Sequence, residues 1–375
     1  MSADIDHRSL GVSYFNSTWD LINSTNRTLE QDRDMLTRAF ASHQHWMEAG
    51  STDGNLAIND WQRFREGDGM KPEQVVVDVG RGIQLCYEQI GNPDDPPIVL
   101  IAGLGQQLHG SFPTDFASAL ARRGYQVTRF DNRDVGRSTH MDYPPPKPLA
   151  ILRGGSHPRQ YHLGDMARDT VGLLDVLGYQ DAHLAGISMG GMIAQTVAAH
   201  YPGRVRTLTS IMSTTGARRI GRPAISTWRR LATAKPPRTQ AEAVARDMAL
   251  FRHIGSHGYP FDEERVRERA VTGWDRDPTS AGTARQLAGI FRSGDRTAEL
   301  RAIDVPTLVI HGNRDRMVHP TGGAATARAI PGARLETVAG MGHDLPSGAW
   351  GRVIDLVTDH VASAPVGRTE LKEHR

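Results

Sequence analysis

The sequence has little of what builds disulfides, cysteine-bound metal sites or membrane anchors. Cys86 is the single cysteine among 375 residues, so neither an intramolecular disulfide nor a cysteine-paired zinc or redox site can form. No run approaches the roughly 20 consecutive apolar residues that a membrane-spanning helix needs. The N-terminus also lacks the basic start and apolar stretch of a secretory signal. We therefore expect a cytoplasmic protein without a membrane partner, in which Cys86 is an inert buried thiol on a strand.

A strong charge of either sign is missing as well. The 44 Lys and Arg residues nearly balance 42 Asp and Glu residues, and the formal net charge is +2. Nucleic-acid binding usually requires a marked basic excess, so we expect no nucleic-acid partner. With 38% hydrophobic and 23% charged residues, the composition is typical of a globular protein with a sizeable core.

The spacing of apolar residues divides the chain into three parts. Residues 1–70 have helical spacing and predict an N-terminal helical extension. Two β-rich runs joined by a glycine-rich hairpin, and then alternating strands and helices, predict an α/β core over 71–212 and 301–375. Residues 213–300, rich in arginine and helix formers, predict a helical cap over the carboxyl ends of the strands. The predicted strands are 75–79, 83–89, 98–102, 126–130, 182–187, 205–212, 307–311 and 334–338, and the predicted core helices are 116–123, 164–177, 190–200, 321–329 and 350–362.

The strongest chemical signal is the motif Gly186-Ile187-Ser188-Met189-Gly190-Gly191. It follows a predicted strand and leads into a predicted helix, so Ser188 falls on a tight turn that exposes its hydroxyl above the sheet. Small residues two places before and after the serine are needed because the turn has no room for Cβ atoms. The helix N-terminus also favours a developing negative charge. The motif predicts Ser188 as a nucleophile; the alternative is a serine that only caps the helix.

A nucleophilic serine needs a base and an acid that orients the base, in the order Ser, Asp, His in this type of fold. Asp315 follows the predicted strand 307–311 at its carboxyl end, whereas Asp304 precedes that strand at the wrong end. His343 lies on a glycine-flanked loop after the last predicted strand. We predict Asp315 as the acid and His343 as the base; the alternatives are a turn aspartate that caps the next helix and a surface histidine. His311 ends a strand, where we expect it to be packed.

Stabilising the oxyanion of a tetrahedral intermediate needs two backbone N–H groups. We predict that Met189, directly after the nucleophile, supplies one. The turn Ala102-Gly103-Leu104-Gly105 after the third strand supplies the other through Leu104, although a plain glycine turn is the alternative. This chemistry requires no metal and no organic cofactor.

These segments, with the loop from Asp131 to Ser138, resemble the α/β-hydrolase superfamily. Within it the chain is most similar to the branch of aclacinomycin methylesterase and proline iminopeptidase-like enzymes, over about residues 73–362. Three departures stand out: Ala102 replaces a histidine that many relatives have, Asp134 replaces a glycine, and residues 1–70 fall outside the family. From its turn formers and opposite charges, we interpret the Asp131–Ser138 loop as structural.

The resemblance implies an α/β-hydrolase fold and a serine hydrolase that acts through an acyl-enzyme intermediate. We expect a small-molecule partner, a small or medium, fairly apolar carboxylic ester, with a methyl ester as the sharper prediction. An acyltransferase with the same three residues and a non-catalytic ligand receptor on this fold remain alternatives. The basic cap argues against proline iminopeptidase activity, which needs acidic residues for the substrate amine. A homodimer is left open.

Overall fold

The computed structural model describes residues 72–147, 157–279 and 281–364. The chain divides into two units, Met1–Lys71 and Pro72–Arg375. The predicted helical extension, residues 1–70, lies outside the described residues. The division into extension, core and cap therefore stays a prediction, and the description below concerns the second unit.

Eight strands of the described part form one sheet in the order β1-β2-β4-β3-β5-β6-β7-β8. The first two strands pair antiparallel with each other, β2 also pairs antiparallel with β4, and all remaining pairs are parallel. The prediction of a mostly parallel eight-stranded sheet is confirmed. The strands are β1 Val75–Asp78, β2 Gln84–Ile90, β3 Pro97–Ile101, β4 Gln126–Phe130, β5 Ala182–Ile187, β6 Val205–Ile211, β7 Thr307–Gly312 and β8 Arg334–Val338.

The core consists of two apolar layers, one on each face of the sheet. Because side chains alternate along a strand, Val99 and Ile101 of β3 belong to one layer, and Ile98 and Leu100 belong to the other. Helices α7, α8 and α14 contribute to the first layer, while α5 and α15 contribute to the second. A sheet buried on both faces explains why the central strand β3 is a continuous apolar run.

Each core helix that the sequence predicted begins and ends within about two residues of its predicted limits, whereas the short helix α4, Leu108–Ser111, was not predicted. Helix α7 shows how a cap sets the boundary: the His162 side chain accepts a hydrogen bond from the Asp165 amide, and the Asp165 carboxylate accepts one from the His162 amide. This reciprocal capping box fixes the first turn. The core helices are α4 Leu108–Ser111, α5 Thr114–Ala121, α7 Leu163–Val176, α8 Met189–His200, α14 Thr321–Ala329 and α15 Trp350–Ala362.

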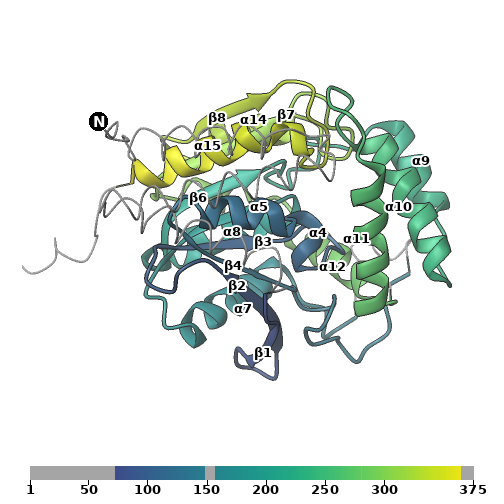
Figure 1. The fold of residues 1–375 in the computed structure, drawn as a ribbon, viewed down its shortest axis with the longest axis horizontal. Coiled ribbons are helices and arrows are strands. Elements are labelled where there is room, and N and C mark those ends of the chain that lie inside the picture. The colour runs from purple at the N-terminus through teal and green to yellow at the C-terminus, as the bar shows by residue number, and fades with distance from the viewer. Residues whose placement is uncertain (1–71, 148–156, 280, 365–375) are drawn as a thin grey trace, which may run out of the picture. The chain divides into compact units, whose positions relative to one another are not determined.

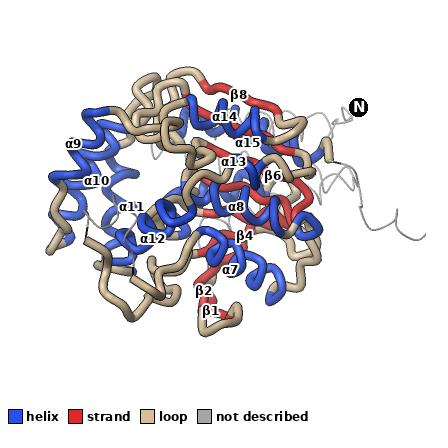
Figure 2. Tube along the Cα trace, turned by 180° about the vertical axis from the view of Figure 1, so that it is seen from behind, coloured by secondary structure: helices blue, strands red, loops and turns tan. Residues whose placement is uncertain are grey.

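Between β6 and β7 the chain leaves the sheet and forms helices α9 to α13. Helices α9, α10 and α11 stand together on one side of the sheet-containing body, at the right of Figure 1 and at the left of the view from behind in Figure 2. Helix α12 contacts α7 of the core, and α13 contacts α8 and α14. The bounds are α9 Ile225–Thr233, α10 Gln240–Ile254, α11 Glu263–Arg276, α12 Ala281–Ser293 and α13 Thr297–Leu300.

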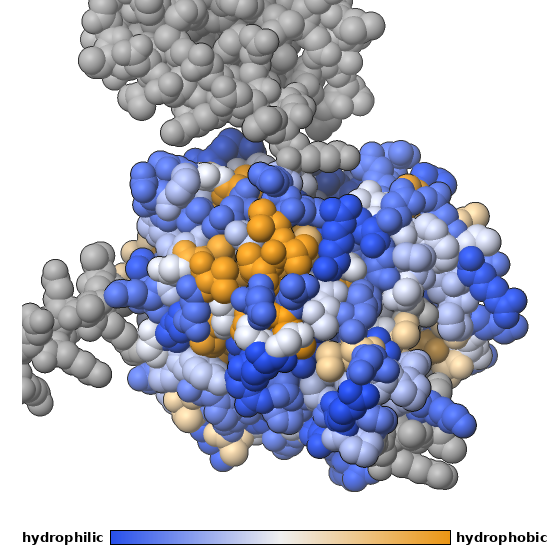
Figure 3. Space-filling model, turned by 90° about the horizontal axis from the view of Figure 1, so that it is seen from below, coloured by the Kyte–Doolittle hydropathy of each residue, from blue (hydrophilic) through white to orange (hydrophobic). Residues whose placement is uncertain are grey.

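The face seen from below carries an apolar patch surrounded by hydrophilic surface (Figure 3). Strand β1 and helix α7 lie on this side of the molecule in Figure 1, and Val75, Val76 and Val176 on them are exposed. Since β1 is an edge strand, its backbone and these side chains form a surface that could pair with another chain. Homodimer formation stays a prediction.

Candidate active site

Ser188 stands between β5 and α8 with φ of 56° and ψ of −116°. Positive φ is a region that residues with a side chain rarely adopt. A Cβ atom at Gly186 would lie 2.2 Å from the Gly190 carbonyl oxygen, and one at Gly190 would lie 1.9 Å from the Ile101 carbonyl oxygen. Only glycine fits at these two positions, so the motif is required by the tightness of the turn that presents Ser188.

The structure brings together the three side chains predicted to carry the chemistry. The Ser188 Oγ atom lies 3.1 Å from His343 Nε2, and His343 Nδ1 lies 2.7 Å from Asp315 Oδ2. Asp315 is on the loop after β7, and His343 is on the loop after β8. Because β5, β7 and β8 run parallel, their carboxyl ends share one edge of the sheet, and segments that are more than a hundred residues apart meet there.

The Asp315 carboxylate is buried and fully hydrogen-bonded. Its Oδ1 atom accepts bonds of 2.8 Å from the amides of Met317 and Val318, and His311 Nε2 lies 3.4 Å from Oδ2. Burial acts to raise the pKa of Asp315, but the charges and hydrogen bonds of His343 and His311 outweigh it and hold the pKa at about 2. Asp315 is therefore ionised at neutral pH and can orient His343. His311, expected only to be packed, is buried and also contacts this carboxylate.

The turn after β3 lies against Ser188: a Cβ atom at Gly103 would be 3.5 Å from the Ser188 Cβ. The amides on either side of Leu104 are both occupied, since Gly103 donates to Ser111 Oγ at 2.9 Å and Gly105 donates to Gln286 Oε1 at 2.8 Å. Among the described residues, no partner is found for the Leu104 amide. The Met189 amide is the first of α8, where no intrahelical acceptor exists. Two amides near Ser188 are thus available to an oxygen atom of a substrate.

The helices between β6 and β7 hold the loops of the site in place. The backbone N–H of His343 donates to the carbonyl of Ile254 at the end of α10, at 2.8 Å. The amide of Gly342 donates to Ser256 Oγ at 2.8 Å, and Gln286 of α12 holds the turn around Leu104. None of these contacts was anticipated, because Ile254, Ser256 and Gln286 carry no motif that marks them.

The Asp131–Ser138 loop joins the core to the same helices through two buried ion pairs. Asp131 pairs with Arg276 of α11 at 2.7 Å, and Asp134 pairs with Arg285 of α12 at 2.7 Å. Asp134 adopts φ of 72°, the left-handed conformation that glycine takes without strain. Having aspartate instead of glycine at this position therefore adds a carboxylate that binds Arg285 of α12. Arg276 and Arg285 are further residues that sequence patterns did not single out.

Within the described ranges, no group of three or more His, Cys, Asp or Glu side chains is arranged to hold a metal ion. Over the same ranges, no helix has both the length and the apolar character needed to span a membrane.

A serine raised on a strand-to-helix turn, bonded to a histidine and an aspartate from later loops at the same sheet edge, is the arrangement that α/β hydrolases share. The sequence agrees with this class. A family model described as "alpha/beta hydrolase fold" matches residues 96–346, and the chain belongs to that family.

Individual relatives cover most of the described unit. Rhodomycin D methylesterase DauP of Streptomyces sp. (strain C5) is 30% identical over 304 residues, which span 76% of this chain and 97% of that protein. Rhodomycin D methylesterase DnrP of Streptomyces peucetius is 29% identical over the same shares of the two chains. Among solved structures, a hydrolase from Pseudomonas aeruginosa PA01 has a TM-score of 0.57 at 24% identity and covers 78% of this chain and 99% of its own. This last likeness concerns the fold.

Proposed function

We propose that this protein is a serine hydrolase that cleaves a carboxylic ester through an acyl-enzyme intermediate. Ser188 is the nucleophile, His343 the general base and Asp315 the carboxylate that orients it. The observation that carries the proposal is the continuous hydrogen-bond chain from Ser188 Oγ through His343 to Asp315. Membership of the α/β hydrolase family and the methylesterase names of the relatives support it.

In the first half of the reaction, Ser188 Oγ attacks the ester carbonyl while His343 Nε2 takes its proton. The carbonyl oxygen becomes an oxyanion that accepts hydrogen bonds from the Leu104 and Met189 amides. His343 then returns the proton to the leaving alkoxide, and the alcohol departs from the acyl-enzyme. In the second half, His343 activates water, which releases the acid and restores Ser188.

The substrate is a small-molecule ester, and a methyl ester is the sharper proposal, since the relatives DauP and DnrP are named as methylesterases. The protein's own side chains and backbone amides suffice for the steps above, so the proposed mechanism uses no cofactor. The cytoplasmic location stays a prediction from the sequence.

The test is labelling with a fluorophosphonate probe, together with turnover of p-nitrophenyl butyrate. We expect the probe to label Ser188, and Ser188→Ala to lose labelling and about 10⁴- to 10⁶-fold in rate. Ser347→Ala, at an exposed serine outside the site, is the matched control and should keep both. Labelling elsewhere, or turnover that survives in Ser188→Ala, would refute the mechanism.

Two further outcomes separate the rival functions. An acyltransferase would transfer the acyl group to an added alcohol in preference to water, and product analysis detects this. A ligand receptor on this fold would show no turnover although the protein is folded. Either result would replace the proposed hydrolysis.

A further inference from the structure

Arg269 of α11 is a cation buried under the cap without an anionic contact. Its guanidinium lies over the ring of Phe251 from α10, 3.7 Å from the ring centre. The Nε and Nη2 atoms are buried and have no hydrogen-bond partner, and among the described residues no carboxylate lies within ion-pair distance of this side chain. Burying a charged group without a partner is costly, so the arrangement suits a ligand that supplies the missing acceptor.

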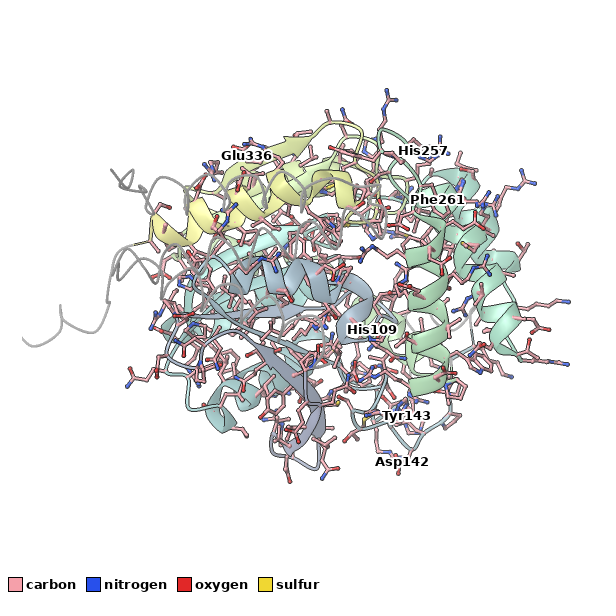
Figure 4. All side chains as sticks on the ribbon, viewed as in Figure 1. His109, Asp142, Tyr143, His257, Phe261 and Glu336 are labelled. Carbon is pink, nitrogen blue, oxygen red and sulfur yellow. The ribbon has the colours of Figure 1, made fainter. Side chains whose placement is uncertain are left out.

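Arg269 lines a cavity of about 90 Å³ between the cap and the core. The core side is formed by Gly105, Gln106 and His109, and the cap side by Trp274 and other residues of α10 and α11. Figure 4 places His109 where the core meets the helices at the right of the view. The volume is enough for a small polar group such as a carboxylate, which is little larger than a few water molecules.

The wall of the cavity includes the end of the turn that carries Leu104. Gly105, on its wall, follows Leu104, whose amide we propose as an oxyanion donor, and the same turn lies against Ser188. On the other side, Asp344 follows His343 directly, and its charge acts to raise the pKa of Arg269. A substrate whose carbonyl sits at Ser188 can therefore extend one end toward Arg269.

The cavity wall carries two arginines, Arg246 and Arg269, and two aspartates, Asp247 and Asp277, so its formal charges cancel. Burial and nearby arginines lower the pKa of His109 to about 3, so its ring is neutral and can form hydrogen bonds at neutral pH. Asp247 of α10 pairs with the adjacent Arg246, and Asp344 is hydrogen-bonded to Ser256. What distinguishes Arg269 is that no carboxylate of the described residues contacts it.

We propose that this cavity, defined by Arg269 and His109, is a subsite for a carboxylate of the substrate. The preferred substrates are then half-esters: an ester group at Ser188, an apolar chain, and a free carboxylate that accepts hydrogen bonds from Arg269 and His109. This inference rests on the proposed function and names its substrate class. A carboxylate is favoured over a neutral oxygen because it also neutralises the buried guanidinium.

The test compares monomethyl esters of glutarate, adipate and suberate with the neutral methyl esters of pentanoate, hexanoate and octanoate, with acid release followed by pH-stat. The wild-type protein should prefer the half-ester of the fitting length by about 10-fold or more in kcat/KM. Arg269→Met should lower kcat/KM for that half-ester by about 10- to 100-fold and leave the neutral esters close to wild type. Arg267→Met is the matched control, since Arg267 is on the same helix, is 49% exposed and pairs with Glu263; it should change neither series.

Inhibition gives a second readout that does not depend on cleavage of a half-ester. Adipate should inhibit hydrolysis of p-nitrophenyl butyrate competitively in wild type and in Arg267→Met, more strongly than hexanoate does, and Arg269→Met should lose this difference. If Arg269→Met fails to fold, the wild-type protein alone still tests the subsite, through half-esters against neutral esters and adipate against hexanoate. The carboxylate subsite is refuted if kcat/KM shows no preference for a half-ester of any length and adipate inhibits no more strongly than hexanoate. That result would not contradict the proposed esterase activity. Absence of turnover on every ester, with no probe labelling of Ser188, overturns the proposed function instead.

Discussion

Replacement of Gln286 by leucine tests whether helix α12 holds the turn around Leu104, the proposed oxyanion donor, in the geometry that the reaction needs. Gln286 is 0% exposed. Its Oε1 atom accepts from the Gly105 amide at 2.8 Å, and its Nε2 atom donates to the Arg133 carbonyl at 2.8 Å. Leucine has a similar volume but can form neither bond, so the buried Arg133 carbonyl and the partly buried Gly105 amide lose their partners.

The expected size of the effect follows from those two groups. A buried donor or acceptor left without a partner costs about 1–3 kcal/mol, and the partly buried Gly105 amide costs less, so the free energy of unfolding should fall by roughly 2–4 kcal/mol. Deleting one oxyanion donor typically costs about 10²- to 10³-fold in kcat. Here the Leu104 donor is loosened rather than deleted, so we expect kcat to fall by about 10- to 100-fold, with KM little changed because ground-state binding does not use the oxyanion contact.

Gln160→Leu is the matched control for this experiment. Gln160 is 4% exposed, and its Nε2 atom donates to the carbonyls of Tyr161 and Arg285 at 3.0 and 2.9 Å, away from the turn. Both variants should lose stability in urea unfolding, but only Gln286→Leu should lose kcat toward p-nitrophenyl butyrate. Gln286→Glu, which keeps an acceptor for the Gly105 amide, should retain more kcat than Gln286→Leu. Equal loss of kcat in the two leucine variants, or wild-type kcat in folded Gln286→Leu, would show that the bond has no catalytic role.

Two further predictions concern stability. Arg285→Met leaves the Asp134 carboxylate buried and unpaired and should lower the free energy of unfolding by about 3–5 kcal/mol. The double variant Asp134→Gly/Arg285→Met removes the unpaired charge at a position whose φ of 72° suits glycine, but it also removes the acceptor of the Tyr161 hydroxyl and the Met141 amide. It should therefore lose less than the sum of the two single variants; losses that simply add in urea unfolding would contradict this pairing. Burial lowers the pKa of His183 from 6.5 to about 4, so between these pH values the unfolded chain binds a proton that the folded chain does not, and stability should fall as the pH falls through this window. His183→Gln should flatten that slope in urea titrations from pH 7 to pH 4, and an unchanged slope would exclude His183 as its source.

Many strand and helix limits could be predicted from the local spacing of apolar and turn-forming residues. Strands 126–130, 182–187 and 334–338 were predicted with their observed limits, because turn-forming residues bound these β-rich runs in the sequence. Helix α7 was displaced by one residue at each end, since its start depends on the reciprocal bonds of His162 and Asp165 rather than on apolar spacing. The short helix α4 has only four residues, too few to show the repeating spacing of apolar residues that predicts a helix.

The glycine-flanked serine motif and the two loops with Asp315 and His343 were also visible in the sequence. Their signal is local: a Cβ atom at Gly186 or Gly190 would collide with the backbone, and each loop directly follows a strand. That the three side chains lie within hydrogen-bond distance depends on parallel pairing of β5 to β8, which the strand–helix alternation predicted.

The contacts between the site and the helices between β6 and β7 could not be predicted from the sequence, because they depend on the tertiary structure. Gln286 reaches Gly105 across 181 residues, and Arg276 reaches Asp131 across 145. Among the described residues, no carboxylate pairs with Arg269, whereas Arg276 and Arg285, on the same stretch of chain, each pair with one. The sequence does not show which of these arginines will form an ion pair. That depends on the direction in which each side chain points and on how deeply it is buried. A tight turn is determined by residues next to it in the sequence. An ion pair, or a buried arginine without a carboxylate partner, depends on distant segments that come together only in the folded chain.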